Sequence, residues 1–352
     1  MSSPRYRWAI ALGLTLAPFA GAAWGQYHFE RFDIPQLGSA VSPNGINDAG
    51  DIVGRPGFLW IKGTYSKLEL DRTGAVSSVG AEGISNNGLI VGSYFVNDPP
   101  GSTTFSSSFL RYTTGHHADL SIMAYGVNSL GWAVGDCAGQ PSCAFRLPAP
   151  GAYLWQPSST PQGIYTLIGN PNNSESETDA RDINDAGLIV GFTLRYAGGA
   201  TGFVTSAANP AGDLQEIAYP GARDTQIFGV NNSGDITGVY DRSKGFVRTT
   251  HGEFIDLGEG VYPEDINDHG IVVGSYDVGD FQLAGFIATP AIPEPRTWTA
   301  ILIGAVCLCL FRCVTQRQTP KLPARSSDLL TFNSVWRWRP SRASRRHPLP
   351  TA

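Results

Sequence analysis

The residue types that carry most enzyme chemistry are scarce in this chain and are not grouped. Nucleophilic catalysis needs a base beside a serine or cysteine, and that base is usually histidine. The histidines between the two ends of the chain are His28, His116, His117, His251 and His269. None of them stands in a serine or cysteine motif, and the neighbouring pair at 116–117 would point to opposite faces of a strand rather than share a metal. We therefore predict no catalytic residue, no cofactor and no metal site.

Closely spaced carboxylates and amides offer a second chemistry, the binding of calcium by oxygen ligands. The stretch NDAG from Asn47 is one example, but its acids drift away in later copies. The second copy reads SNNG from Ser85 and the third reads NSLG from Asn128. A turn-forming residue followed by glycine is what stays constant. The pattern favours a structural turn, with a calcium loop as the alternative.

The cysteines suggest oxidative chemistry of a structural kind. Cys137 and Cys143 lie six residues apart in DCAGQPSCAF. In the oxidising compartment that the chain ends predict, we expect them to form a disulfide that closes a small loop. Cys307, Cys309 and Cys313 lie in or beside an apolar segment, where cysteine behaves as a small hydrophobic residue.

The turn belongs to a ten-residue phrase, GINDAGDIVG, that starts at Gly45 and recurs five more times. The other copies start at Gly83, Gly126, Asp182, Gly229 and Asp265. An apolar residue ends one strand, the Asn/Asp-Gly turn follows, and a β-branched strand leads to a second glycine. We expect neighbouring backbones to crowd at these second glycines. They are Gly54, Gly92, Gly135, Gly191, Gly238 and Gly274.

Two further strands complete each repeat. One reads small-Phe-apolar, as in GFLW from Gly57, CAFRL from Cys143 and GFIA from Gly285. The other alternates polar and apolar residues, as in SKLEL from Ser66. Successive phrases are 36 to 56 residues apart, with the longest step caused by an insertion around 137–163. Four short strands at this period are typical of propeller blades.

The sixth repeat lacks its last strand, and the N-terminus supplies a candidate. Residues 27–34 alternate in the manner of a fourth strand, and no turn phrase precedes them. We predict an all-β, six-bladed propeller-like ring of four-stranded repeats over residues 26–290. The strand from Tyr27 to Ile34 should close the ring by pairing antiparallel with the strand around Phe286.

These repeats resemble the HAF family of bacterial extracellular repeat proteins, whose units combine a GINDxGxIVG-like phrase with a small residue and phenylalanine. The resemblance covers Tyr27 to Pro290. No copy has the histidine of the His-Ala-Phe signature, and only Ala144-Phe145 keeps the Ala-Phe pair. The resemblance implies an extracellular setting and no particular activity.

The N-terminus has the features of a secretory signal peptide over residues 1–25. Arg5 and Arg7 form a positive region, Trp8 to Ala20 is apolar, and small residues follow up to Gly25. An uncleaved anchor is the alternative.

The C-terminus resembles the PEP-CTERM sorting signal of Gram-negative bacteria over residues 291–313. Pro293-Glu294-Pro295 is followed by an apolar segment, expected to be a transmembrane helix, and then by Arg312. The resemblance implies recognition by an exosortase and cleavage near the Pro-Glu-Pro stretch. Residues 314–352 depart from the family pattern and read as a basic, disordered tail. The positive-inside rule would hold that tail in the cytoplasm.

The balance of charge narrows the function. Acidic residues outnumber basic ones between Gln26 and Pro290, which argues against nucleic acid as a partner. We predict an exported protein, first anchored in the membrane and then held at the cell surface or in the extracellular matrix. It would be a non-catalytic binding or structural scaffold whose partners include polysaccharide or surface proteins. The alternatives are a glycan-active enzyme, recognised by Asp, Glu and His from different blades in one central mouth, and a self-associating structural protein.

Overall fold

A computed structural model describes residues 26–38, 41–71, 76–96, 105–137, 147, 150–160, 162–169, 176–195, 198–212, 214–280 and 282–291. Contacts divide the chain into a unit from Met1 to Ile292 and a unit from Pro293 to Ala352, and every described residue belongs to the first. The described ranges contain strands and no helix. They therefore include no helix that could cross a membrane. The predicted signal peptide, membrane helix and basic tail lie outside these ranges.

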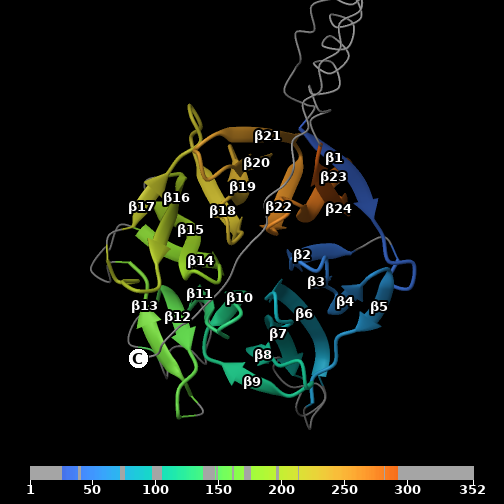
Figure 1. The fold of residues 1–352 in the computed structure, drawn as a ribbon, viewed down its shortest axis with the longest axis vertical. Helices are drawn as coiled ribbons and strands as arrows, with labels where there is room; N and C mark the ends of the chain where they lie inside the picture. Colours follow the sequence, from blue (N-terminus) through green and yellow to red (C-terminus); the bar gives the residue numbers. More distant parts are fainter. Residues whose placement is uncertain are drawn as a thin grey trace, which may run out of the picture. The chain divides into compact units, whose positions relative to one another are not determined.

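The strands form six antiparallel sheets of four strands each, arranged as blades around a ring (Figure 1). Blade I consists of β2 (Ser42–Ile46), β3 (Ile52–Arg55), β4 (Phe58–Ile61) and β5 (Thr64–Lys67). Blade II consists of β6 (Val76–Ile84), β7 (Ile90–Val96), β8 (Phe105–Arg111) and β9 (His117–Leu120). Blade III consists of β10 (Met123–Val127), β11 (Ala133–Asp136), β12 (Ala152–Gln156) and β13 (Ile164–Leu167).

The second half of the ring repeats this plan. Blade IV consists of β14 (Ser176–Ile183), β15 (Leu188–Arg195), β16 (Ala200–Ser206) and β17 (Gln215–Ile217). Blade V consists of β18 (Thr225–Val230), β19 (Ile236–Tyr240), β20 (Lys244–Arg248) and β21 (Phe254–Glu259). Blade VI consists of β22 (Val261–Ile266), β23 (Val272–Gly279), β24 (Gln282–Pro290) and β1 (Tyr27–Phe32). The fold is therefore the predicted six-bladed propeller.

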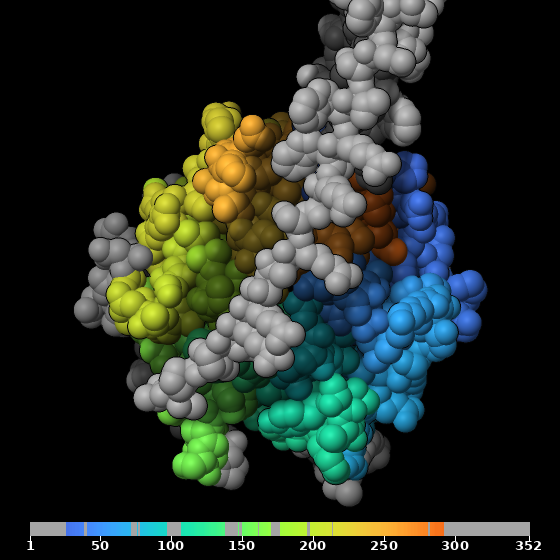
Figure 2. All heavy atoms as spheres, in the orientation of Figure 1, coloured from blue at the N-terminus to red at the C-terminus, as the bar shows by residue number. Residues whose placement is uncertain are grey.

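The N-terminal strand closes the ring as the sequence predicts. β1 is the outer strand of blade VI and pairs antiparallel with β24, with Phe29 opposite Ala288 and Phe32 opposite Gly285. The strand ends at Phe32, two residues earlier than expected, and Ile34 instead makes an isolated bridge to Gly38. Colour runs once around the ring in Figure 2, from the blue of β1 back to the orange and red of blade VI beside it.

Each repeated phrase builds the hairpin between the two innermost strands of its blade. In blade I, the Asn47 N–H donates to the Asp51 carbonyl, and the Gly50 N–H donates to the Asn47 carbonyl. Gly50 has a φ of 79°, the left-handed conformation in which glycine costs little. The Asn-Asp-x-Gly stretch is thus a β-turn, as the constancy of its glycine indicates.

The second glycine of the phrase faces an aromatic ring in every blade. Gly54 lies opposite Phe58 in the register of blade I, and Gly135 lies opposite Tyr153 in blade III. A Cβ at Gly54 would lie 1.9 Å from the Ser42 carbonyl oxygen, and in the other five blades the corresponding distance is 1.8 to 2.2 Å. The predicted crowding is therefore confirmed, and its cause is a close carbonyl beside a buried ring.

Blade III corrects one strand assignment. The sequence predicts CAFRL from Cys143 as the third strand, but that position belongs to β12, which reads AYLWQ. Tyr153 takes the place of phenylalanine there and is fully buried. Because tyrosine fills the same space against Gly135, the Phe-based pattern pointed to the wrong part of the insertion.

The core lies between the blades. Each of the six hydrophobic clusters takes residues from two neighbouring blades. The cluster between blades VI and I contains Phe32 and Ile34 from the N-terminal segment, packed with Phe58 of β4. Burial therefore links each blade to the next, and the N-terminal segment forms part of the last joint.

Candidate functional site

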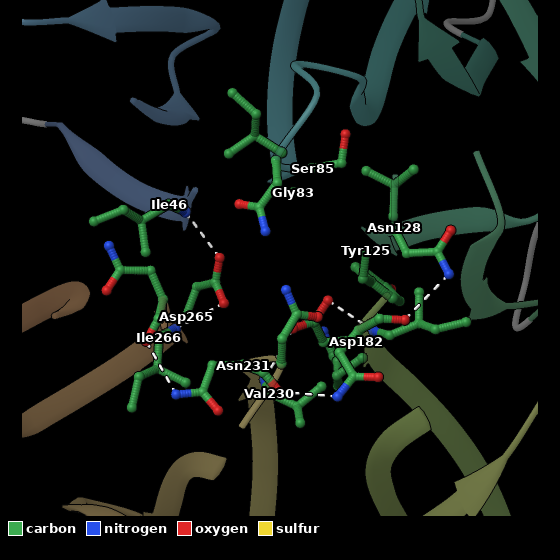
Figure 3. A pocket seen from close by; sticks show the side chains of 18 of the residues that line it. Ile46, Gly83, Ser85, Tyr125, Asn128, Asp182, Val230, Asn231, Asp265 and Ile266 are labelled. Carbon is green, nitrogen blue, oxygen red and sulfur yellow. Dashed lines mark hydrogen bonds between the residues drawn. The ribbon is translucent and has the colours of Figure 1, made fainter. Parts of the chain in front are cut away.

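The innermost strands of all six blades surround a cavity of about 90 Å³ at the ring centre (Figure 3). Each of these strands carries a β-bulge just before its turn, which leaves one residue unpaired. All six unpaired residues line the cavity, and we call them the bulge ring. Its members are Asn44, Glu82, Tyr125, Arg181, Phe228 and Glu264.

One side of the bulge ring is held by Glu82. Its carboxylate accepts a 2.8 Å hydrogen bond from Arg55 Nε, and a second Arg55 nitrogen contacts the same oxygen. Its other oxygen accepts a 2.9 Å bond from Asn44 Nδ2. Although burial raises the pKa of Glu82, Arg55 opposes that shift. The carboxylate is thus paired and fixed.

Arg181 occupies the opposite side, where aromatic rings enclose it. Its guanidinium carbon lies 4.2 Å from the centre of the Tyr125 ring and 5.7 Å from that of Phe228. Its Nη2 donates to Asp179 Oδ2 at 2.7 Å. That bond is the one hydrogen bond found for this side chain among the described residues, and its buried Nε has no acceptor there. The guanidinium is therefore rigidly placed with most of its donors unused.

Glu264 is the exception in the bulge ring. Among the described residues, no hydrogen bond or ion pair reaches its carboxylate, although it lines the cavity. Burial raises the pKa of Glu264 to about 7, with the positive charge of Arg181 opposing that rise and the negative charge of Glu82 adding to it. Glu264 is half-buried, and a carboxylate that has lost part of its water without gaining a protein partner is unfavourable, which makes this residue the most unusual feature of the cavity.

Two further carboxylates line the cavity but are engaged by the backbone. Asp182 accepts from the Ile183 N–H at 2.8 Å and from the Val230 N–H of the next blade at 2.9 Å. Asp265 accepts from the Ile266 N–H at 2.7 Å and from the Ile46 N–H at 2.8 Å, and Figure 3 shows the latter bond between blades. Burial raises the pKa of Asp182 to about 7 and that of Asp265 well above its ordinary value.

The asparagines of the repeated phrase join the blades at the turn end of the cavity. In blade IV, Asn184 Oδ1 accepts from the Leu188 N–H of its own turn, and its Nδ2 donates to the Asn231 carbonyl of blade V at 2.9 Å. Equivalent links run from blade V to VI, from VI to I, from I to II and from III to IV. Each asparagine thus closes its own turn and fastens the next blade.

The residue after each asparagine makes a second set of links. The Asp268 N–H donates to Asp48 Oδ1 at 2.8 Å, and the Asp48 N–H donates to Asn86 Oδ1 at 2.8 Å. Blades III to VI are joined in the same way. These carboxylates and amides serve as acceptors for backbone N–H groups, which supports the turn interpretation over the calcium alternative. The described residues contain no group of three His, Cys, Asp or Glu placed to hold a metal.

The joint between blades II and III lacks both links. Ser85 stands where the other blades have asparagine, and its hydroxyl bonds within its own turn to Asn87 Oδ1 and the Leu89 N–H. The only turn-level bond across this joint among the described residues runs from Asn87 Nδ2 to the Ser129 carbonyl, at 2.8 Å. This joint therefore has fewer turn-level hydrogen bonds than the other five.

Among the described residues, no histidine or cysteine lines the cavity, whereas Asp48, Ser85 and Asn128 of the turn phrases do. His116 forms an ion pair with Asp71, and His117 lies 3.7 Å from an Asp119 oxygen, both on blade II. Cys137 is buried at the end of β11, while Cys143 lies outside the described residues, so the disulfide stays a prediction. The sorting-signal residues Pro293, Glu294, Pro295 and Arg312 also lie outside them.

The sequence analysis did not predict the residues of the bulge ring as a site. Its residues stand immediately before the phrase, and their types differ in all copies except for the two glutamates. The signal in the sequence was that one residue varies directly before a phrase that is otherwise repeated.

No protein-family model matches this chain, and neither does any curated protein.

Proposed function

We propose that this chain is an exported, non-catalytic binding scaffold whose propeller is displayed at the cell surface or in the extracellular matrix. The observation that supports binding is the cavity at the ring centre. Six blades contribute side chains of different chemistry to it, and most of those side chains are fixed by bonds to neighbours. Fixed polar groups that converge on one cavity are typical of ligand sites.

A glycan-active enzyme is the second candidate, because carboxylates from different blades do share one central cavity. Glycoside hydrolysis generally requires two carboxyl groups that act on opposite sides of one bond. Glu82, Asp182 and Asp265 are each engaged by protein donors, which leaves Glu264 as the carboxylate of the cavity without a protein partner. None of the histidines that the structure describes lines the cavity. These features favour binding over hydrolysis.

The ends of the propeller suit display at a membrane. The Ala291 N–H donates to the Gln26 carbonyl at 2.7 Å, so the chain enters and leaves the ring at the same point of blade VI. Removal of a signal peptide after Gly25 would leave β1 intact as the closing strand. Anchoring through residues 291–313 would likewise hold the ring through blade VI, from which the chain leaves.

The experiment is expression of the full chain in a Gram-negative host that carries an exosortase, followed by cell fractionation and mass spectrometry. We expect export through the Sec system, transient anchoring, and a mature protein that begins near Gln26 and ends near Pro293. A mature mass that still includes Ala352 would contradict cleavage. Retention of the whole chain in the cytoplasm would contradict the proposed setting.

The scaffold role needs its own measurement. The secreted protein should bind components in a screen of glycans and surface proteins, and it should release no product from the glycans. Turnover that disappears in Glu264→Gln would instead support the enzyme alternative.

A further inference from the structure

The cavity at the ring centre holds two groups of opposite charge with unused hydrogen-bonding capacity. Glu264 has no partner among the described residues, and Arg181 has donors without acceptors. The positive charge of Arg181 opposes the rise in the pKa of Glu264, and both residues line the same cavity. No ion pair joins them, however, and space remains between blades IV and VI.

The surroundings keep this arrangement rigid. Arg181 lies against Tyr125 at 4.2 Å, and the Tyr125 hydroxyl donates to Asp136 at 2.8 Å. On the other side, Arg55 and Asn44 fix Glu82. Neither Arg181 nor Arg55 can move to pair with Glu264 without breaking its bond to Asp179 or Glu82, respectively. Glu264 and Arg181 therefore both line the cavity without being paired with each other.

We infer that the cavity binds a compact zwitterion, of the kind of a free α-amino acid, with its ammonium group at Glu264 and its carboxylate at Arg181. This inference deepens the proposed binding role and rests on it.

Charge selects this class of ligand over others. A simple cation would satisfy Glu264 but would leave the unused donors of Arg181 without an acceptor. A simple anion would pair with Arg181 but would meet the negative charges of Glu82 and Glu264. A neutral polyol would leave the charge of Glu264 uncompensated, which is unfavourable in a cavity that restricts water. A ligand with both charges satisfies both sides.

Size limits the ligand further. One water molecule requires roughly 10–15 Å³ when volume is measured in this way. A cavity of about 90 Å³ therefore admits a ligand the size of about six to nine water molecules. Glycine, alanine and serine fit within this volume, whereas a disaccharide does not fit within it entirely.

The cost of the empty arrangement also points to a ligand. An unpaired carboxylate in a half-buried position lowers the stability of the fold, and glutamine at the same position would not carry that cost. Stabilising changes that lower function are characteristic of functional sites. An ammonium group beside Glu264 would supply the missing partner.

Isothermal titration calorimetry on the purified full chain, kept in mild detergent at pH 8, tests the inference. Glycine, L-alanine and L-serine are the probes, while ethylamine, acetate and glycerol each offer one part of the chemistry. We expect at least one amino acid to bind roughly tenfold or more tightly than each of these three. Absence of binding by every amino acid would overturn the inference, and so would equal binding of glycerol or ethylamine.

Two variants locate the site. Glu264→Gln should weaken amino-acid binding tenfold or more, while Glu216→Gln, which removes an exposed carboxylate from β17, should leave it unchanged. Thermal unfolding at the same pH shows whether Glu264→Gln is folded. Full binding by Glu264→Gln would overturn the assignment. Fractionation of the same variants separates this failure from that of the proposed function, because export and display do not depend on Glu264.

Discussion

At the scale of single residues, Glu264 makes the stability of the ring depend on pH. Burial raises its folded-state pKa to about 7, above the ordinary value for glutamate. The protonated form is therefore favoured by folding, and its contribution is fully present below the unfolded pKa of about 4.3. That contribution is lost as the pH rises through about 7, when the half-buried carboxylate ionises without a partner.

We predict that Glu264→Gln stabilises the protein by about 1–3 kcal/mol at pH 8 and has little effect at pH 4. Urea unfolding of both proteins at the two pH values measures this difference. Glu216→Gln is the control, because its carboxylate is mostly exposed on β17. An equal gain at both pH values would show that the effect does not come from ionisation.

A second residue-scale prediction concerns the glycine that faces the aromatic ring. A Cβ at Gly238 would lie 2.0 Å from the Gln226 carbonyl oxygen, so alanine there must displace backbone. We expect Gly238→Ala to cost about 3 kcal/mol or more, in the range of severe overpacking. Gly221→Ala is the matched control, since nothing lies within 4 Å of its Cβ and only its φ of 79° opposes the change. We expect that control to cost about 1 kcal/mol by urea unfolding. Similar costs for the two would contradict the crowding argument.

At the scale of elements, the asparagine links predict that the joint between blades II and III can be improved. Ser85→Asn would keep an acceptor for the Leu89 N–H and would add an amide directed at the Asn128 carbonyl of blade III. We expect a gain of about 0.5–1.5 kcal/mol, the net value of one hydrogen bond. The reverse change, Asn231→Ser, should cost a similar amount, because it removes the link to the Asn267 carbonyl. If urea unfolding showed that both changes destabilise, the links would not be what joins the blades.

The hairpins and blades could be predicted from the sequence because their signals repeat. The turn at Asn47 recurs in every copy as a turn-forming residue followed by glycine, and period and turn type together indicate four strands per repeat. The third strand of blade III was placed wrongly because tyrosine replaces phenylalanine at 153 within a long insertion. Because tyrosine and phenylalanine are similar in size and shape, the Phe-based strand pattern could not locate this strand within a variable segment.

The cavity could not be predicted in the same way. Bulges direct Asn44 and Glu264 to the centre, yet a bulge depends on how two strands pair rather than on a distinctive residue type. The meeting of Arg181 with Glu264 joins positions 83 residues apart, and only the closed ring defines which of six variable positions face one another. The cavity is therefore a property of the assembled blades.

At the scale of the whole molecule, closure determines which parts of the ring are essential. Blade VI contains residues from both ends of the propeller, because β1, the first strand in the sequence, pairs with β24, the last. Phe29 packs on Phe286 with ring centres 5.2 Å apart, and Phe32 packs on Trp60 of blade I at 5.5 Å. The N-terminal segment therefore joins blade VI to blade I as well as completing its sheet.

A protein that begins at Gly38 should consequently be much less stable than one that begins at Gln26. The shorter chain loses the burial of Phe32 and Ile34, each worth about 1.5–3 kcal/mol, and it exposes the edge of β24. For a domain of this size, such a loss corresponds to a fall in Tm on the order of 10 °C, together with aggregation through the open edge. Differential scanning calorimetry and light scattering of the two proteins measure both effects. Adding a peptide of residues 26–37 to the shorter chain should restore part of the Tm, because the peptide can pair with β24 as β1 does. Equal melting of the two proteins would mean that the first strand contributes little and that the remaining strands hold the ring without it.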